Sequence, residues 1–382
     1  MIRLPRRAPA SAAKPRLIVV GPLPPPYHGA SVSTSLLVSS EVLQRRFALQ
    51  HVDTSDRRLG RDNIGRWDLT NVSGGLGGAI RLLIGMRGRR GVVYLPIAQN
   101  APAFLRDSLY IHVAALCRWD VAVHLRGSDF GDLYRAQPPA MRAWMRLTLR
   151  RVTSMGVMGE SLRGVFDGLI APERIAVVPN GTPEVSLPDV AADPRQILFF
   201  SNLRRRKGIV EAVDAAISVL REVPQARFVF VGDWESAALE AEVRDRARPA
   251  GEQIEFRPAA TGDSRFALFA SSSMLLFPPV EPEGHPRVVL EALAAGVPVI
   301  TTDRGAIAET VVDGTSGFVL NDPVPEELAD RMLRLLRDRD LRDRMARAAR
   351  SRYLERFTLD VTDAAFADWI GGLPRAKHGP RR

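Results

Sequence analysis

The residues with the clearest capacity for chemistry lie in one segment, Pro278–Ile300. Glu283 stands in a proline-rich loop after an apolar run, and Glu291 stands eight residues later in a stretch with helical spacing. Gly284 permits close backbone approach, and Pro286 suits a first helical turn, whose free amides attract anions. Two carboxylates at one helix start are suited to bind paired sugar hydroxyls. The alternative is that Glu283 caps the helix and Glu291 is a solvated surface acid.

A basic cluster, Arg204–Lys207, stands between the apolar run Gln196–Phe200 and a helical pattern over Ile209–Glu222. Cations placed directly after a strand and before a helix are well positioned to contact a phosphate. The alternative is a basic turn on the surface.

In the N-terminal half, His124 and Arg126 lie at the end of the apolar run Val121–Leu125. Residues two apart on a strand share a face, so we expect both side chains to point into one cleft. The alternative for His124 is a histidine with satisfied hydrogen bonds near a strand end. Asp129 is the nearest carboxylate that could act as a base, and its alternative role is to cap a helix or turn.

Apolar runs alternate with helical patterns along the chain, which predicts an α/β fold with parallel strands covered on both faces. The predicted strands are Arg16–Val20, Gly91–Leu95, Val121–Leu125, Arg174–Thr182, Gln196–Phe200, Arg227–Val231, Gln253–Phe256, Met274–Phe277, Pro298–Thr302 and Gly317–Leu320. The predicted helices are Ala30–Leu43, Met141–Val152, Ile209–Glu222, Ser236–Ala247 and one beginning at Pro325.

The length of 382 residues predicts two domains. We expect a disordered basic tail over residues 1–15, an N-terminal domain over 16–183 and a C-terminal domain over 184–354, with a proline-rich linker over 183–194. A last helix over about 355–372 is expected to pack back on the N-terminal domain. Open α/β domains bind ligands at the carboxyl ends of their strands, which places the chemistry in a cleft between the two domains.

Composition excludes several classes of protein. The chain has 46% hydrophobic and 25% charged residues, as ordinary globular proteins have. Cys117 is the single cysteine, so it forms no intrachain disulfide and no CxxC site, and it indicates a reducing compartment, the cytoplasm. No apolar run reaches the roughly 18 to 20 residues of a membrane span.

Positive charge is concentrated in the N-terminal half. Residues 1–180 contain 25 Lys and Arg against 12 Asp and Glu, a balance of +13, whereas residues 181–382 have a balance of −3. This asymmetry predicts an anionic partner. In the pattern over Met141–Val152, one face is apolar or neutral while Arg142, Arg146 and Arg150 recur every four residues. We expect either reversible attachment to the anionic inner membrane face or a core-packed surface helix with its arginines in water.

The segment that ends Glu291-Ala292-Leu293-Ala294-Ala295-Gly296-Val297-Pro298-Val299 resembles the signature of the family-4 glycosyltransferases. These are retaining enzymes of the GT-B class, which has two Rossmann-like domains facing across a cleft. The resemblance extends to Gly21–Gly29, Val177–Gly181, Ser201–Gly208, Thr301–Glu309 and Gly314–Gly317.

The resemblance implies roles for individual residues. Glu291 would hold the ribose hydroxyls, Glu283 the transferred sugar and Lys207 the diphosphate. Glu283, Lys207, His124 and Arg126 are the implied catalytic residues. The implied donor-binding residues are Gly29, Asn202, Arg204, Arg206, Lys207, Glu283, Gly284, His285, Pro286, Arg287, Val288 and Glu291.

Two positions depart from the family pattern. Asn202 stands where the family usually has an arginine, so Arg204 or Arg206 would replace its charge. Arg126 stands where the family commonly has a histidine, with His124 two residues earlier.

The implied activity is retaining transfer of a sugar from a nucleotide-diphosphate sugar to a saccharide or lipid-linked acceptor, in polysaccharide or glycolipid synthesis at the cell surface. Front-face attack would let the leaving phosphate take the acceptor proton. No cofactor or metal is expected.

Two further segments resemble known motifs. Asp338-Arg339-Asp340 has the sequence of a metal-binding Asp-x-Asp motif, but its helical, arginine-rich context predicts a salt-bridged surface. Gly74–Gly78 follows no strand, and we predict a flexible turn there.

Competing functions are a nucleic-acid-binding protein and a GT-B-like epimerase or phosphorylase. With 7% aromatic residues and no aromatic RNA-binding signature, we expect no nucleic-acid partner. A dinucleotide oxidoreductase is disfavoured because neither domain's first strand leads into Gly-x-Gly-x-x-Gly.

Overall fold

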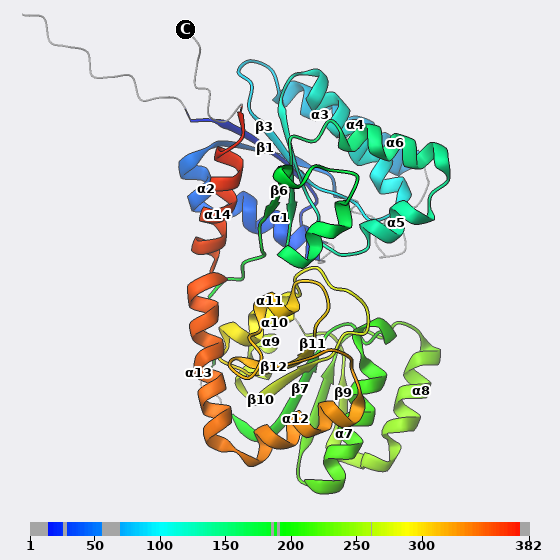
Figure 1. Cartoon of the computed structure of the whole chain (residues 1–382), viewed down its shortest axis with the longest axis vertical. Helices are drawn as coiled ribbons and strands as arrows, with labels where there is room; N and C mark the ends of the chain where they lie inside the picture. The colour runs from blue at the N-terminus through cyan, green and yellow to red at the C-terminus, as the bar shows by residue number, and fades with distance from the viewer. Residues whose placement is uncertain are drawn as a thin grey trace, which may run out of the picture.

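Two parallel six-stranded sheets form the framework of the computed structural model, which describes residues 14–25, 29–55, 69–184, 187–188, 192–260 and 262–374 (Figure 1). The N-terminal strands are β1 (Arg16–Gly21), β2 (Ala48–Asp53), β3 (Val92–Pro96), β4 (Asp120–His124), β5 (Ser154–Val157) and β6 (Ile175–Val177). The C-terminal strands are β7 (Asp193–Phe200), β8 (Arg227–Val231), β9 (Ile254–Arg257), β10 (Ser272–Phe277), β11 (Val299–Thr302) and β12 (Gly317–Leu320). Most of the predicted strands therefore exist, to within a few residues.

Helices cover both faces of each sheet. In the N-terminal lobe they are α1 (Gly29–Ser39), α2 (Glu41–Arg46), α3 (Leu69–Gly85), α4 (Ala101–Leu116), α5 (Phe130–Ala136) and α6 (Pro139–Leu149). In the C-terminal lobe they are α7 (Ile209–Glu222), α8 (Ala237–Ala247), α9 (Asp263–Ala270), α10 (Arg287–Ala294), α11 (Ile307–Thr310), α12 (Pro325–Arg337) and α13 (Arg339–Arg356). Aliphatic strand residues that are fully buried on both sides give each lobe two apolar layers.

Strand order fixes where ligands can bind. The N-terminal sheet runs β2-β1-β3-β4-β5-β6 and the C-terminal sheet β12-β11-β10-β7-β8-β9. The order of successive strands reverses between β1 and β3 in the first sheet and between β7 and β10 in the second. A crevice forms at such a switch point because the loops on either side of it leave in opposite directions. Ser201–Lys207 follows β7 and Pro278–Pro286 follows β10, so both chemical segments flank the second switch point.

The chain returns to the first lobe at its C-terminal end. Helix α13 packs on α10, and the next helix, α14 (Leu359–Gly371), packs on α2 (Figure 1). Phe366 is buried, and its ring lies edge-on to the Tyr94 ring of β3 at a centroid distance of 4.9 Å. The indole Nε1 of Trp369 donates to Ser154 Oγ of β5 at 2.9 Å. The N-terminal core is therefore completed by the last helix described.

Two sequence expectations about helices differ from the structure. The Gly74–Gly78 segment is not a turn but lies within α3, where Gly78 packs against the hydroxyl end of Tyr110 on α4. Close contact between the two helices outweighs the poor helix propensity of glycine. The predicted helix Ala30–Leu43 is divided into α1 and α2, because the Ser40 hydroxyl accepts from the Leu43 amide and caps a new helix.

The predicted apolar face of α6 packs on the core. Met145, Thr148 and Leu149 on this face are buried, and Trp144 Nε1 donates to Ser108 Oγ of α4 at 3.1 Å. Arg146 and Arg150 remain exposed on the other side of the helix. Of the predicted tail, residues 1–13 lie outside the described residues. No helix in the described part of the chain is long and apolar enough to cross a membrane.

Candidate active site

A cleft with a volume of about 1600 Å³ lies between the two lobes. All the residues that the sequence assigned to donor binding line it, and so does Arg126. They come from the loops after β7 and β10, from the start of α10, and, across the cleft, from the start of α1 and the loop after β4. The topology thus brings the predicted residues together, while their individual roles in binding stay predictions.

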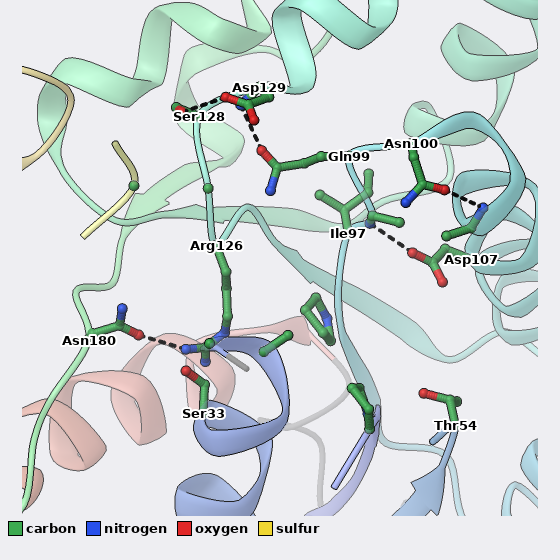
Figure 2. Close-up of a pocket in the computed structure, with 18 of the residues that line it drawn as sticks. Ser33, Thr54, Ile97, Gln99, Asn100, Asp107, Arg126, Ser128, Asp129 and Asn180 are labelled. Carbon is green, nitrogen blue, oxygen red and sulfur yellow. Dashed lines mark hydrogen bonds between the residues drawn. The ribbon is translucent and has the colours of Figure 1, made fainter. Parts of the chain in front are cut away.

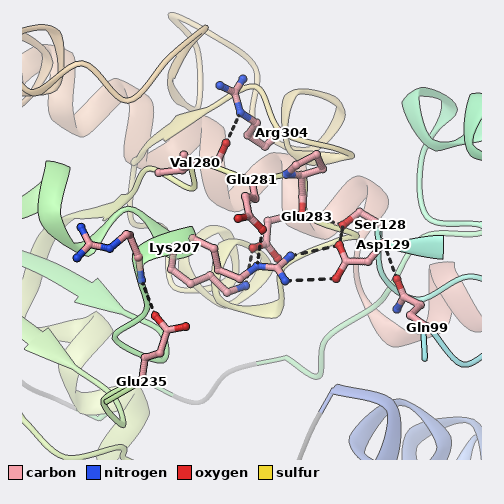
Figure 3. A network of polar contacts seen from close by, with 12 residues as sticks. Gln99, Ser128, Asp129, Lys207, Glu235, Val280, Glu281, Glu283 and Arg304 are labelled. Atoms are coloured by element: carbon pink, nitrogen blue, oxygen red, sulfur yellow. Dashed lines mark hydrogen bonds and ion pairs between the residues drawn. The ribbon is translucent and has the colours of Figure 1, made fainter. Parts of the chain in front are cut away.

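Lys207 and Glu283 form the central ion pair of the cleft (Figure 3). Lys207 Nζ lies 2.5 Å from Glu283 Oε1, and the two side chains are 21% and 11% exposed. Gly208, which follows Lys207, has a φ of +77°, and a Cβ there would stand 1.9 Å from the Pro278 carbonyl oxygen. Glycine is therefore required where the loop after β7 meets the loop after β10. This contact holds the ammonium beside the carboxylate.

The four basic residues after β7 divide between two directions. Arg204, Arg206 and Lys207 line the cleft, whereas the Arg205 guanidinium pairs with Glu242 of α8 at 2.5 Å. Arg204 is exposed, and none of the ion pairs among the described residues involves it. The predicted phosphate turn therefore presents three of its four basic residues to the cleft.

Glu291 lies one turn into α10 and is 5% exposed. Its Oε1 lies 3.2 Å from Nη1 of Arg265 on α9. Burial raises the pKa of the Glu291 carboxyl, and the positive charges of Arg265 and Arg287 counteract part of this rise. The carboxylate is thus poorly solvated but retains acceptor capacity beside the cleft.

Arg287, the first residue of α10, crosses to the N-terminal lobe. Its Nη2 donates to Ser33 Oγ of α1 at 2.7 Å, and its Nη1 donates to the Gly181 carbonyl oxygen at 3.3 Å. Burial lowers the pKa of Arg287 to about 10, and the nearby charge of Arg126 adds to this effect. It remains a cation at neutral pH and joins α1, α10 and the connection between β6 and β7. This connection, which begins after Val177 and so earlier than predicted, is the linker of the structure.

A second set of contacts joins the two lobes beside the Lys207–Glu283 pair (Figure 3). The Arg206 guanidinium lies 3.3 Å from Asp129 of the N-terminal lobe and 3.3 Å from Glu281 of its own lobe. The Ser128 hydroxyl donates to the Pro282 carbonyl oxygen at 2.7 Å. Asp129, the one carboxylate that the sequence offered as a base, is therefore committed to an ion pair.

Arg126 is fixed by three hydrogen bonds. Its Nε and Nη2 donate to the Tyr94 hydroxyl at 3.1 and 2.8 Å, and its Nη1 donates to Asn180 Oδ1 at 2.8 Å (Figure 2). Tyr94 lies on β3, and Asn180 lies in the linker. The guanidinium is therefore held rigidly on the N-terminal wall.

His124 does not line the main cleft. It is 1% exposed, its Nδ1 lies 3.2 Å from the Tyr94 hydroxyl, and it borders a separate cavity of about 20 Å³. Burial holds the pKa of His124 well below 6.5, and the charge of Arg126 contributes. The expectation that both side chains enter the cleft is correct for Arg126 alone, because β4 ends at His124 and the face-sharing rule of strands no longer applies beyond it.

His285 has its ring in the domain interface. Its Nδ1 accepts from the Asn180 amide at 3.0 Å, and its Nε2 lies 2.8 Å from Thr310 Oγ1. Burial lowers the pKa of His285 to about 3. The neutral ring connects the linker to α11, so His285 borders the cleft while its nitrogens bind other protein groups.

Several residues of the cleft escaped the sequence analysis. Arg265 on α9 pairs with Glu291, Gln99 after β3 accepts from the Asp129 amide at 2.7 Å, and Asp107 on α4 accepts from the Ala98 amide at 2.8 Å (Figure 2). Gln99 could have been predicted as a cleft residue, because it lies in the loop that follows a strand. Arg265 and Asp107 carry no comparable signal, because contacts with distant segments place them.

The described residues contain no group of three or more His, Cys, Asp or Glu side chains that could hold a metal ion. In the Asp338-Arg339-Asp340 sequence, the Asp338 carboxylate caps α13 by accepting from the Leu341 amide at 2.8 Å. Arg339 lies 3.5 Å from Asp343 one turn later. These contacts agree with the expected helical, salt-bridged surface.

The sequence of residues 188–352 matches a family model described as Glycosyl transferases group 1. The chain is 34% identical over 171 residues to the Vi polysaccharide biosynthesis protein VipC/TviE of Salmonella typhi, covering 43% of this chain. It is 28% identical over 282 residues to the N-acetyl-alpha-D-glucosaminyl L-malate synthase of Bacillus anthracis, covering 66% of this chain. The chain spans 28% of the length of the first relative and 71% of the second.

A crystal structure of Anabaena Alr3699/HepE, in complex with UDP and glucose, is similar to this structure with a TM-score of 0.69 at 16% identity. The match covers 94% of this chain and 100% of that one. The predicted GT-B fold, with two Rossmann-like domains facing each other, is thereby confirmed.

Proposed function

We propose that this chain, whose residues 188–352 are a glycosyl transferases group 1 domain set in a GT-B fold, moves a sugar from a nucleotide-diphosphate sugar to a saccharide or lipid-linked acceptor. The observation that carries the proposal is the convergence of Lys207, Glu283 and Glu291 on one interdomain cleft. The similar proteins support this proposed activity. One relative is named for polysaccharide biosynthesis, and the similar structure was solved with UDP and glucose.

The donor is proposed to bind along the C-terminal wall. Glu291 would accept hydrogen bonds from the ribose hydroxyls, and its pairing with Arg265 favours the charged form of the buried carboxyl against the effect of burial. Glu283 would accept from hydroxyls of the transferred sugar. Lys207 would then exchange part of its contact with Glu283 for the donor diphosphate.

The diphosphate gains negative charge as the bond to the sugar breaks, and cations already aimed at it lower the barrier. Lys207 and Arg204 on the C-terminal wall and Arg126 on the opposite wall supply such charge, together with the first amides of α10. Because these groups can stabilise the leaving group, we expect transfer without a metal ion or another cofactor.

Retention of anomeric configuration is the proposed stereochemical outcome. Asp129 is held by Arg206, and His124 is buried outside the cleft, so neither is placed to attack the sugar. A front-face reaction, in which the leaving phosphate takes the acceptor proton, needs no protein nucleophile. The single thiol of Cys117 suits the cytoplasm, which we propose as the place of action.

The test is a thermal-shift series with UDP, GDP and ADP sugars, followed by transfer assays with the nucleotide that binds. One nucleotide sugar should raise the Tm, and Glu291→Gln should abolish most of that shift. NMR of the product should show the anomeric configuration of the donor. If no nucleotide sugar raises the Tm or loses its sugar with any saccharide or lipid-linked acceptor, the proposal is wrong.

A further inference from the structure

Helix α3 is apolar on both of its faces. On one face Ala79, Leu82 and Met86 are buried in the N-terminal core. On the other, four large aliphatic side chains are exposed to solvent: Leu76 (55%), Ile80 (58%), Leu83 (45%) and Ile84 (54%). Their spacing places them on one stripe along the helix. A water-facing stripe of this kind marks an interaction surface, because surface helices normally carry polar residues there.

The stripe belongs to a layer in which α3 packs on α4 and α4 packs on α6 (Figure 1). We call the outward side of this layer the helical face, comprising residues 74–90, 101–118 and 139–151. These segments contain ten arginines and one acid. The acid is Asp107, which is 2% exposed and paired with Arg106 at 2.8 Å. The helical face therefore presents positive charge without exposed carboxylates.

We propose that the helical face docks on an anionic phospholipid bilayer, with the α3 stripe entering the interface between headgroups and acyl chains. Arginines of the helical face, among them Arg87 after α3 and Arg142 and Arg146 on α6, would contact lipid phosphates. Branched aliphatic side chains suit acyl chains, whereas single-stranded nucleic acids are bound by stacking on exposed aromatic rings. The one tryptophan of α6, Trp144, is engaged with His112 and Ser108 of α4.

The same helix also borders the cleft. Leu76 and Arg81 of α3 both line the interdomain cavity, so the docked stripe runs into its N-terminal wall. A lipid-linked acceptor whose anchor stays in the bilayer would therefore reach the cleft along α3. This second step rests on the proposed transferase function, whereas docking itself does not.

Co-sedimentation of the full chain with vesicles tests the docking. We expect binding to vesicles of equal parts phosphatidylcholine and phosphatidylglycerol, and little binding to phosphatidylcholine alone. Ile80→Gln with Ile84→Gln should lower the partition coefficient on the order of tenfold, because two buried aliphatic chains are lost. The matched control is Leu354→Gln with Val361→Gln, which removes exposed aliphatic residues from α13 and α14 and should bind like the wild type.

Charge is tested by Arg142→Gln with Arg146→Gln against Arg344→Gln with Arg347→Gln, an exposed pair on α13. The first should weaken binding to the anionic vesicles and the second should not. Melting curves establish that each variant folds, and the thermal shift with the nucleotide sugar that binds, read separately, reports on the transferase site. Equal wild-type partition into both kinds of vesicle, equal effects of the two variants in either pair, or retention on DNA in place of vesicles would each refute the docking.

Discussion

The buried carboxyl of Glu291 is unfavourable for the stability of the fold but useful for the proposed binding of the donor. The carboxyl is buried beside the cleft, and burial raises its pKa in spite of Arg265 and Arg287. Burial therefore disfavours the charged form of Glu291 in the folded chain, while the proposed ribose contact uses the carboxylate. Such opposition is typical of functional sites.

We predict that Glu291→Gln weakens donor binding roughly tenfold to a hundredfold, the cost of losing charge-assisted hydrogen bonds. The same change should leave the free energy of unfolding unchanged or higher, since it removes a desolvated charge. Isothermal titration with the donor and chemical denaturation measure the two quantities. A variant that loses both donor affinity and stability would show that the carboxylate is structural.

The wild type should show a related pH dependence. Because the Glu291 pKa is raised, its protonation begins at a higher pH than that of an ordinary glutamate. Donor affinity is therefore expected to fall on acidification, from a pH at which glutamates with an ordinary pKa are still ionised, and isothermal titration over a pH series measures this fall.

Lys207 is predicted to act mainly on turnover. Lys207→Ala should lower kcat roughly a hundredfold or more while changing donor affinity less, because charge on the leaving group develops in the transition state. The matched control is Arg205→Ala, a neighbouring cation that faces Glu242 away from the cleft. Initial-rate kinetics separate kcat from KM. Equal losses of kcat in both variants would indicate a general effect of charge or folding.

The sequence was informative at this scale wherever a residue follows a strand. Glu283 and Lys207 could be predicted because each lies in a loop that leaves the carboxyl end of a strand. The pairing of Lys207 with Glu283 spans 76 positions, and that of Arg287 with Ser33 spans 254. Local patterns contain no information about such pairs, since they depend on how the lobes are set against each other.

Helix α14 contributes buried residues to the core of the N-terminal lobe. Phe366 is 2% exposed and lies between α14 and the N-terminal sheet. We predict that Phe366→Ala lowers the free energy of unfolding by about 3–5 kcal/mol, the usual cost of an aromatic cavity. Val361→Ala on the same helix, where Val361 is 40% exposed, should cost about 0.5 kcal/mol or less. Urea denaturation measures both, and similar small losses would mean that α14 is not part of the N-terminal core.

The partner that covers a helix face is harder to predict than the face itself. The period of the sequence over α6 correctly indicates one apolar face, and this face packs on the core. In α3 the glycines Gly74–Gly78 obscure the helix, and packing against Tyr110 stabilises it. A periodic pattern shows that a face is apolar. It does not show whether protein or another apolar phase covers it.

At the scale of the whole molecule, Gly284 sets how closely the lobes approach. A Cβ at this position would stand 2.9 Å from the Arg126 carbonyl oxygen and 2.9 Å from Gly127 Cα, both backbone atoms of the other lobe. Gly284→Ala should therefore hold the lobes apart and lower kcat by up to about a hundredfold. Gly77→Ala, a helical glycine with open space around it, is the matched control and should be neutral or slightly stabilising. Unchanged transfer by Gly284→Ala would show that this approach is not needed.

The interface also makes stability depend on pH. The folded state keeps His285 neutral down to about pH 3, whereas an unfolded histidine takes up its proton near pH 6.5. The unfolded state thus binds more protons between these values, and the free energy of unfolding decreases as pH falls through them. At pH 5 the loss from this residue is about 2 kcal/mol. The Tm should fall from pH 7.5 to pH 5, and His285→Gln should start lower and show a shallower slope. Parallel slopes would contradict this assignment.

The fold of the protein could be predicted from the sequence. The alternation of strands and helices predicted two α/β domains, the resemblance of the segment around Glu291 to a glycosyltransferase signature implied the GT-B arrangement, and the similar structure confirms this fold. This succeeds because strand and helix periods are local, and because parallel strands deliver their following loops to one edge of the sheet.

Only the tertiary structure shows which residues of the two lobes come into contact. It placed Arg126 on the cleft and His124 behind it, directed the ring nitrogens of His285 to the linker and α11, and left the α3 stripe exposed. Each of these outcomes depends on contacts between segments far apart in the chain. The free energy of such contacts depends on burial and geometry in three dimensions, which no window of neighbouring residues contains.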